Sequence, residues 1–201
     1  MSGTALVALA DAAERAGSAR VRLTPQQKIV VLDVADDRVD ALKTELNTLG
    51  LQAEPSPWRR ATMACTGIEF CKLAIVETKE RAIRLVEDLE KRLADVHPDV
   101  PISIHLNGCP NACARTQVAD IGLKGMIVAD DSGNQVEGFQ VHLGGGLGLD
   151  AGFGRKLRGL KVTSAELGDY VERLVRRFAA QREPDERFAQ WVLRADEADL
   201  R

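Results

Sequence analysis

The four cysteines form two pairs whose spacing suits a metal centre. Cys65 and Cys71 enclose "TGIEF", and Cys109 and Cys113 enclose "PNA". Cysteine thiolates bind zinc and iron–sulfur clusters in proteins. Paired zinc ligands are usually separated by about two to four residues, which the first pair exceeds, whereas clusters accept varied spacings and a proline beside a ligand. We therefore expect an iron–sulfur cluster, with a zinc site or unliganded thiols as alternatives.

The composition favours a soluble, cytoplasmic protein. The 201 residues are 45% hydrophobic and 28% charged, and the formal net charge of −3 gives no support to a nucleic-acid partner. No apolar run approaches the ~18 residues of a membrane span. The start of the chain lacks a basic region and carries Asp11 and Glu14, which argues against a secretion signal. In a reducing cytoplasm, cysteines serve metal or redox chemistry more often than disulfides.

Residues 1–60 are predicted to fold as helix, strand, strand and helix, followed by a linker. This order resembles a ferredoxin-like unit whose first strand is missing, so we expect the chain to begin inside a larger element. A smaller α+β layer that is complete as written is the alternative. The predicted elements are a helix over 4–17, strands over 20–24 and 28–34, a helix capped by Asp36 or Asp37 and ended by Gly50, and a linker over 53–60.

Residues 61–201 alternate helical and strand patterns. Each cysteine pair lies at a boundary between predicted elements, where loops can converge at one edge of a sheet. Trp58 and Trp191 are expected to pack in cores, and His97, His105 and His142 to be structural. The predicted elements are a helix over 71–96, a half-buried strand over 101–106, two strands within 120–146 joined by a turn at 130–134, a basic loop with Arg155, Lys156, Arg158 and Lys161, and a helix begun by a Thr163–Glu166 capping box.

Three stretches carry a family resemblance: "ACTGIEFCKLAIVETK", "NGCPNACARTQVADIGLKG" and "LGGGLGLD". Together they resemble the C-terminal half of the siroheme-dependent sulfite and nitrite reductases, in which the second cysteine pair is written G-C-P-N-x-C. The resemblance covers essentially the whole chain. It implies an α+β fold, with an incomplete ferredoxin-like half-domain over 1–60 and an α/β siroheme/iron–sulfur domain with a mixed sheet over 61–201.

The resemblance also implies the cofactors and their ligands. Cys65, Cys71, Cys109 and Cys113 would hold a 4Fe-4S cluster, and Cys113 would also be the axial ligand of the siroheme iron. A helical segment over 109–113 would place its two cysteines on one face. Siroheme carries many carboxylates, so we expect Asn111 and Arg115 to bind the cofactor, while the basic loop at 155–161 meets carboxylates, an acidic donor or only solvent.

The implied function is the six-electron reduction of sulfite to sulfide or of nitrite to ammonia, with electrons from ferredoxin or a similar donor. No catalytic residue is expected here, because in the resembling enzymes the N-terminal half supplies the groups that grip the anion. The isolated chain should therefore turn over poorly and expose an apolar patch and a sheet edge. The alternatives are a haem-free iron–sulfur electron-transfer or binding module and a zinc-stabilised structural domain.

Overall fold

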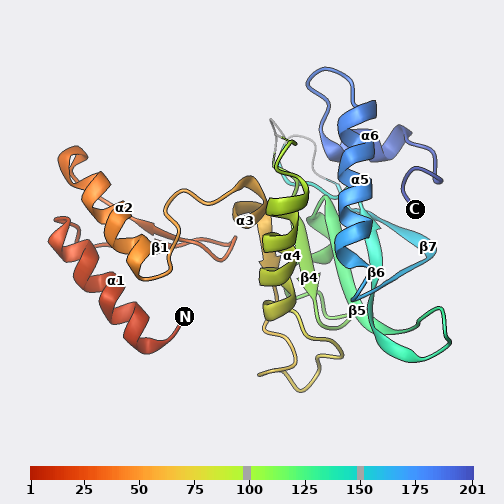
Figure 1. Cartoon of the computed structure of the whole chain (residues 1–201), viewed down its shortest axis with the longest axis horizontal. Helices are drawn as coiled ribbons and strands as arrows, with labels where there is room; N and C mark the ends of the chain where they lie inside the picture. Colours follow the sequence, from red (N-terminus) through yellow and green to blue (C-terminus); the bar gives the residue numbers. More distant parts are fainter. Residues whose placement is uncertain (97–100, 149–151) are drawn as a thin grey trace. The chain divides into compact units, whose positions relative to one another are not determined.

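The computed structural model describes residues 1–96, 101–148 and 152–201. These residues form two compact units, Met1–Ser56 and Pro57–Arg201 (Figure 1). The linker predicted over 53–60 therefore ends early, since Pro57–Ala61 form a short helix, α3, in which Trp58 is buried. None of the described helices is long and apolar enough to cross a membrane.

The first unit has the predicted order of helix, strand, strand and helix. Ser2 caps the first helix by accepting a hydrogen bond from the Ala5 N–H, and Gly50, with φ of +72°, follows the last. Neither Asp36 nor Asp37 caps a helix through its side chain as predicted, because both lie within a 3-10 turn. The elements are α1 (Gly3–Arg15), β1 (Val21–Leu23), antiparallel β2 (Ile29–Val31), the turn η1 (Asp36–Arg38) and α2 (Val39–Thr48).

The second unit is built on a five-stranded mixed sheet, which confirms the predicted sheet type. The first three strands in spatial order are parallel and the last two pairings are antiparallel. The strands are β3 (Thr62–Ala64), β4 (Ile104–Asn107), β5 (Ile121–Ala129), β6 (Gln135–Leu143) and β7 (Arg155–Thr163), in that spatial order.

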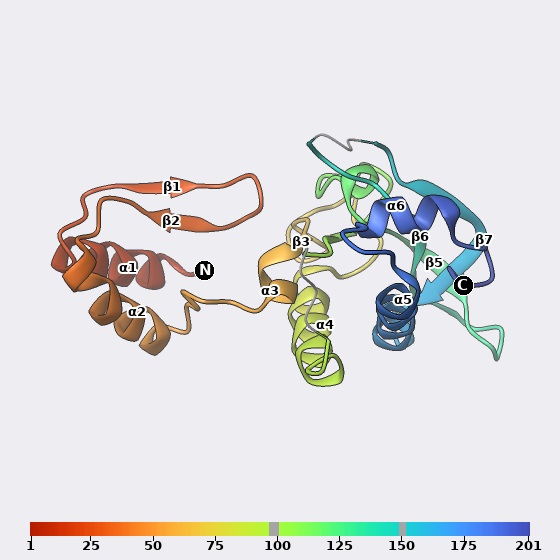
Figure 2. The ribbon, with the colours of Figure 1, turned by 90° about the horizontal axis from the view of Figure 1, so that it is seen from above.

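Two helices cover one face of this sheet. α4 (Lys79–Arg92) and α5 (Leu167–Gln181) lie side by side along it (Figures 1 and 2). Their apolar stripes enter one core with the sheet, and α6 (Phe188–Arg194) adds Trp191, which is fully buried as expected. Thr163 and Glu166 exchange the predicted capping-box hydrogen bonds just before α5. The short 3-10 turn η2 (Thr116–Val118) lies between β4 and β5 in sequence.

The strand register gives the sheet two chemically different faces. Residues opposite one another point to the same face, and one row across all five strands reads Met63, His105, Gly122, His142 and Lys156. The neighbouring row, which faces α4 and α5, reads Ala64, Leu106, Leu123 and Val141 and belongs to the core. We call the face that carries His105 and His142 the polar face.

Three sequence predictions in this unit were wrong, in a helix boundary, an element type and a degree of burial. The helix predicted over 71–96 begins only at Lys79, because the Glu77 carboxylate accepts the Glu80 and Arg81 N–H groups and ends the preceding loop. The basic segment predicted as a loop is strand β7, which lies at a sheet edge with mostly exposed side chains. The strand predicted as half-buried is buried at every position, because β4 lies inside the sheet and is covered on both faces.

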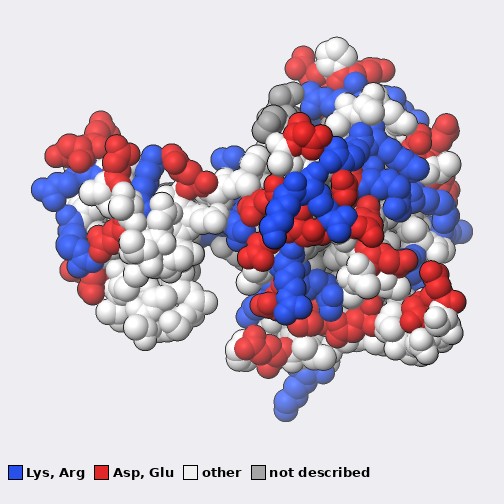
Figure 3. Space-filling view, in the orientation of Figure 1, with Lys and Arg blue, Asp and Glu red and all other residues white. Residues whose placement is uncertain are grey.

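Ion pairs join α4 to α5 outside the core. Arg92 contacts Asp88, Asp169 and Glu172, and Arg176 also contacts Glu172. Acidic and basic side chains are accordingly interspersed over this region of the surface (Figure 3). Because these side chains are partly exposed, each pair adds little stability, and apolar burial is the main force that holds the helices.

Leu89→Ala should therefore destabilise the second unit by about 2–5 kcal/mol, because Leu89 of α4 is fully buried in the core. Urea unfolding followed by tryptophan fluorescence measures this, since Trp58 and Trp191 both lie in this unit. Ile83→Ala is the matched control on the same helix, where 47% of the residue is exposed, and should change the stability by less than about 1 kcal/mol. Equal losses in the two variants would contradict this assignment of the core.

Candidate cofactor site

Backbone hydrogen bonds lock the two cysteine segments together. The Cys65 N–H donates to the Leu106 carbonyl over 2.9 Å, and the Ile75 N–H donates to the Gly108 carbonyl over 2.7 Å. The Gly108 N–H in turn donates to the Cys65 sulfur over 3.1 Å. Two cysteine loops that are distant in sequence therefore share one hydrogen-bonded frame, which we call the cysteine frame (residues 65–76 and 106–115).

The cysteine frame leaves no room for a side chain at Gly125 and little at Gly108. A Cβ on Gly125 of β5 would lie 2.5 Å from Val76 Cγ2 and 2.7 Å from the Asn107 carbonyl oxygen. A Cβ on Gly108 would lie 3.0 Å from the Val76 carbonyl oxygen. Since real Cβ atoms essentially never approach other atoms within 3.0 Å, Gly125 lets the two loops approach closely.

The loop of the first pair is fixed by a buried threonine. The Thr78 hydroxyl donates to the Cys65 carbonyl over 2.9 Å and lies 3.8 Å from the Cys65 sulfur. Gly67, with φ of +76°, turns the chain so that its carbonyl accepts the Cys71 N–H over 3.0 Å. The loop therefore presents Cys65 and Cys71, both half-buried, from a rigid support.

The second pair does not lie on a helix, which corrects the prediction for 109–113. Ala112 and Arg115 have φ values of +54° and +56°, so the chain turns sharply twice. Such left-handed residues cost about 1–3 kcal/mol each and gather at functional sites. The Asn107 side-chain oxygen accepts the Ala114 N–H over 2.6 Å and holds the turn from inside. Cys109 is buried and Cys113 is exposed.

This turn folds back over the polar face of the sheet. A Cβ on Gly122 would lie 2.0 Å from the Thr116 carbonyl oxygen, so η2 rests directly on β5. His105 of β4 contacts this turn, with its Nδ1 3.1 Å from the Arg115 carbonyl oxygen. His105 is therefore a structural residue of the turn, as expected.

Three buried polar atoms on or beside the polar face have no hydrogen-bond partner among the described residues. They are Asn107 Nδ2, Thr116 Oγ1 and His142 Nε2. A buried donor or acceptor without a partner costs about 1–3 kcal/mol. Such atoms in a native fold call for an explanation, and an additional bound group is one.

The polar face is electropositive near β6. Burial lowers the pKa of His142, and the nearby Lys124 and Lys156 lower it further, while a backbone hydrogen bond to Gly154 acts in the opposite direction. His142 is therefore biased toward the neutral state, in which one ring nitrogen can accept a hydrogen bond and the other can donate one. The lysines next to it suit anionic groups such as carboxylates.

The cysteines fit an iron–sulfur cluster by the chemistry of the donor set. All four are free thiols. Within the described residues, no three His, Cys, Asp or Glu side chains are arranged to hold a single metal ion. In a 4Fe-4S cluster each thiolate binds a different iron, and the ligands surround a larger body. The N–H bond to the Cys65 sulfur is also of the kind that tunes such clusters.

Exposed apolar side chains surround the first cysteine pair. The exposed fractions are 51% for Ile68, 70% for Phe70, 64% for Leu73 and 38% for Ile75. The side chains of β1 are also exposed throughout. Apolar groups concentrated in one loop indicate a surface that meets another molecule or another part of a protein.

The other predicted site residues lie on the turn of the second cysteine pair or outside the described residues. Asn111 is exposed, and Arg115 is half-buried with its Nη2 3.2 Å from the Met63 sulfur, so their predicted cofactor contacts stay predictions. His97 and the last two residues of "LGGGLGLD", 149–150, lie outside the described residues. Sequence reasoning missed Asn107 and Thr78, whose only signal was their position beside the cysteine loops.

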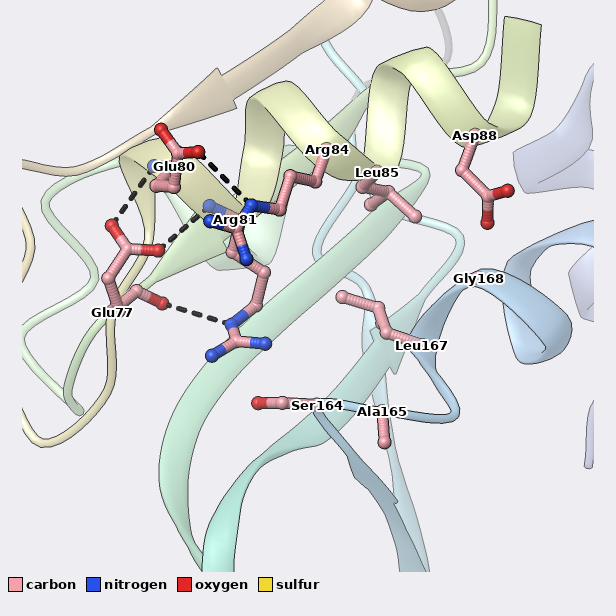
Figure 4. Close-up of a pocket in the computed structure, with 10 residues that line it drawn as sticks. All are labelled: Glu77, Glu80, Arg81, Arg84, Leu85, Asp88, Ser164, Ala165, Leu167 and Gly168. Carbon is pink, nitrogen blue, oxygen red and sulfur yellow. Dashed lines mark hydrogen bonds and ion pairs between the residues drawn. The ribbon is translucent and has the colours of Figure 1, made fainter. Parts of the chain in front are cut away.

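A separate cavity of about 480 Å³ lies between α4 and the connection from β7 to α5 (Figure 4). Its charged groups are already paired, Arg84 with Glu80 and Arg81 with Glu137. The residues drawn in Figure 4 include none of the predicted ligands. The cavity is therefore not the candidate site.

Two family models match the chain. Residues 57–201 match the "Nitrite and sulphite reductase 4Fe-4S domain", and residues 1–49 match the "Nitrite/Sulfite reductase ferredoxin-like half domain". The match to the 4Fe-4S domain begins at residue 57, directly after the first compact unit ends at Ser56. Between them the two models cover nearly all of the described chain.

Curated relatives and solved structures agree with these matches. Sulfite reductase (ferredoxin) 2 of Mycolicibacterium paratuberculosis is 63% identical over 100% of this chain and 37% of its own length. The ferredoxin–nitrite reductase of Synechococcus elongatus is 39% identical over 88% of this chain and 34% of its own length. The Mycobacterium tuberculosis NirA structure has a TM-score of 0.96 at 61% identity, over 100% of this chain and 37% of that one. The chain thus spans little more than a third of these relatives.

Gly125→Ala should reduce cluster retention by about 10-fold or more, because the added Cβ would push the cysteine loops apart. Iron and acid-labile sulfide per chain, measured after timed exposure to a chelator, give the retention. Gly152→Ala is the control in the same unit, since a Cβ there meets nothing within 4 Å. Retention by Gly125→Ala equal to that of the parent chain would show that the close approach is dispensable.

The stability of the second unit should fall as the pH falls through about 6.5. The pKa of His142 is lower in the folded state than its ordinary value of 6.5, so the unfolded chain binds the proton more readily and acid favours unfolding. Urea midpoints between about pH 5 and pH 8 measure the slope. His142→Gln should flatten it, and an unchanged slope in this variant would assign the effect to other groups.

Proposed function

Because this chain belongs to the nitrite and sulphite reductase family, we propose that it is the C-terminal part of an assimilatory sulfite or nitrite reductase. The family match agrees with the resemblance of the cysteine motifs, and the family's 4Fe-4S domain spans residues 57–201. The chain covers about 37% of its sulfite reductase relatives, so the reaction belongs to a longer protein. The first unit serves as the ferredoxin-like half-domain, and residues 61–201 carry the cofactors.

The four cysteines hold the 4Fe-4S cluster in this proposal. The observation that carries it is the pair of hydrogen bonds at Gly108, whose N–H reaches the Cys65 sulfur and whose carbonyl accepts the Ile75 N–H. Neither bond is required by a helix or a sheet ladder. Both serve to bring the C-x5-C and C-x3-C loops together, as a cluster bound by two distant pairs requires.

The polar face and Cys113 receive the siroheme. Cys113 is the exposed member of the quartet, as a thiolate shared with a second group must be. Lys124, Lys156 and the nearby His142 provide partners for carboxylates. Asn111 and Arg115 lie on the turn that bears Cys113. When bound, siroheme and cluster supply electrons to an anion at the siroheme iron.

The substrate is sulfite, with nitrite as the second candidate. Relatives named sulfite reductases share 61–63% sequence identity with this chain, whereas relatives named nitrite reductases share 38–40%. The relatives' names also support ferredoxin as the electron donor. The N-terminal half of the enzyme would cover the exposed apolar loop and supply the groups that grip the anion. A cytoplasmic location would keep the four thiols reduced.

The test is the cofactor content of the chain produced in cells that make siroheme and iron–sulfur clusters. We expect iron, acid-labile sulfide and the visible bands of siroheme in the parent chain. Cys71→Ala should lose the cluster, and Cys113→Ala should lose both groups. Thr66→Ala, at an exposed position beside Cys65, is the control and should lose neither.

Each alternative has its own outcome in the same experiment. A parent chain that binds a cluster but no siroheme would favour the haem-free electron-transfer module. Zinc without sulfide would favour the structural domain. Sulfite reduction by the isolated chain should be very slow, because a positioned cation contributes both binding and charge stabilisation. Rapid turnover would overturn the assignment of the anion-binding groups to another part of the enzyme.

A further inference from the structure

Asn107 holds an unusual place at the end of β4. It is the last residue of the strand, two positions before Cys109, and only 1% of it is exposed. Its carboxamide has two ends with opposite roles, since the oxygen accepts hydrogen bonds and the nitrogen donates two. In the fold, the oxygen has a hydrogen-bond partner and the nitrogen has none among the described residues.

The oxygen end has a partner. Asn107 Oδ1 accepts the Ala114 N–H over 2.6 Å, across the turn that contains Cys113. This bond also fixes the orientation of the amide, because the Ala114 N–H can only donate and a flipped carboxamide would place two donors face to face. Asn107 therefore anchors the peptide that follows Cys113.

The nitrogen end is buried and has no partner among the described residues. Since Nδ2 and Oδ1 share one carbon atom, Nδ2 also lies beside the Cys113–Ala114 peptide. A buried N–H pair without an acceptor costs about 1–3 kcal/mol. A leucine of similar size would avoid this cost, but it would give up the anchor. The arrangement makes physical sense if the bound prosthetic group supplies the acceptor.

Resting on the cluster assignment above, we propose that Asn107 is a positioning residue for Cys113 that also donates a hydrogen bond to an inorganic sulfide of the cluster. The oxygen end sets the conformation of the turn, and the nitrogen end sets the electron affinity of the cluster. Hydrogen bonds to cluster sulfurs stabilise the reduced, more negative state and raise the reduction potential. One side chain thus affects both the conformation of the turn and the reduction potential of the cluster.

Two substitutions separate the two roles. Asn107→Asp keeps an oxygen that can accept the Ala114 N–H but removes the amide donor. Its cluster content should stay close to that of the parent chain, while the reduction potential of the cluster should fall, because the donor is lost and because an ionised carboxylate adds negative charge. Asn107→Ala adds no charge, so a lower potential in the cluster that it retains assigns the effect to the lost donor. Asn107→Ala removes both roles and should shorten cluster retention against a chelator by about 10-fold or more.

The measurements are made on the full 201-residue chain, with the potential taken from an electron paramagnetic resonance titration of the reduced cluster. Asn134→Asp is the control for the same change in the exposed turn between β5 and β6, where it disturbs a local hydrogen bond to Asp130. Circular dichroism establishes that each variant is folded. A misfolded Asn107→Ala leaves the Asp variant to decide the anchor by its cluster content, and an unchanged potential in that variant would still overturn the donor role.

Failure of this inference is distinct from failure of the proposed function. A parent chain that takes up no cluster would overturn the proposed function. A parent chain with a normal cluster, together with an Asn107→Asp potential equal to the parent's, would overturn the donor role alone. Loss of the cluster in Asn107→Asp to the extent seen in Asn107→Ala would overturn the separation of the two roles, since the retained oxygen should hold the turn.

Discussion

The fold of the site depends on the short contact between Gly108 and the loop of the first cysteine pair. Three hydrogen bonds converge there, from Gly108 to the Cys65 sulfur, from Ile75 to Gly108 and from Cys65 to Leu106. Gly125 makes the contact possible by leaving room behind it. Because the bonds link residues about 30–45 positions apart, the sheet must form before the loops can meet. The strands are thus the scaffold, and the frame is assembled on them.

The two faces of the sheet have different roles: one packs in the core, and the other carries the candidate site. The face under α4 and α5 is apolar and closed, with Leu89, Val141 and Val171 fully buried. The polar face carries His105, His142 and the turn of the second cysteine pair, and it includes buried polar atoms without partners. Substitutions on the first face act on unfolding. Those on the second also act on whatever binds there, because this face carries the turn of the second cysteine pair and the buried polar atoms without partners.

Sequence patterns correctly predicted elements that depend on residues close in sequence. They failed where contacts between residues distant in sequence determine the backbone conformation. The α5 stripe and the Thr163–Glu166 box depend on near neighbours and were predicted correctly. The helix start before Lys79 was wrong, because the bond from Ile75 to Gly108 holds that loop in a non-helical path until Glu77 accepts the first helical N–H groups. Ala112 favours helices, so no local signal announced its left-handed turn. The family motif located the cysteines but not the anchor at Asn107.

The features that sequence could not reveal are also those that are unfavourable in isolation. Two left-handed residues, Ala112 and Arg115, lie in the turn of the second cysteine pair, and the unpartnered Asn107 Nδ2 lies at the end of the strand before it. Each costs about 1–3 kcal/mol. A group that binds the turn would relieve part of the cost, so binding and folding are coupled at this place. Strain gathered in one turn, over the face of the sheet opposite the core, is the arrangement expected when a cofactor completes the structure.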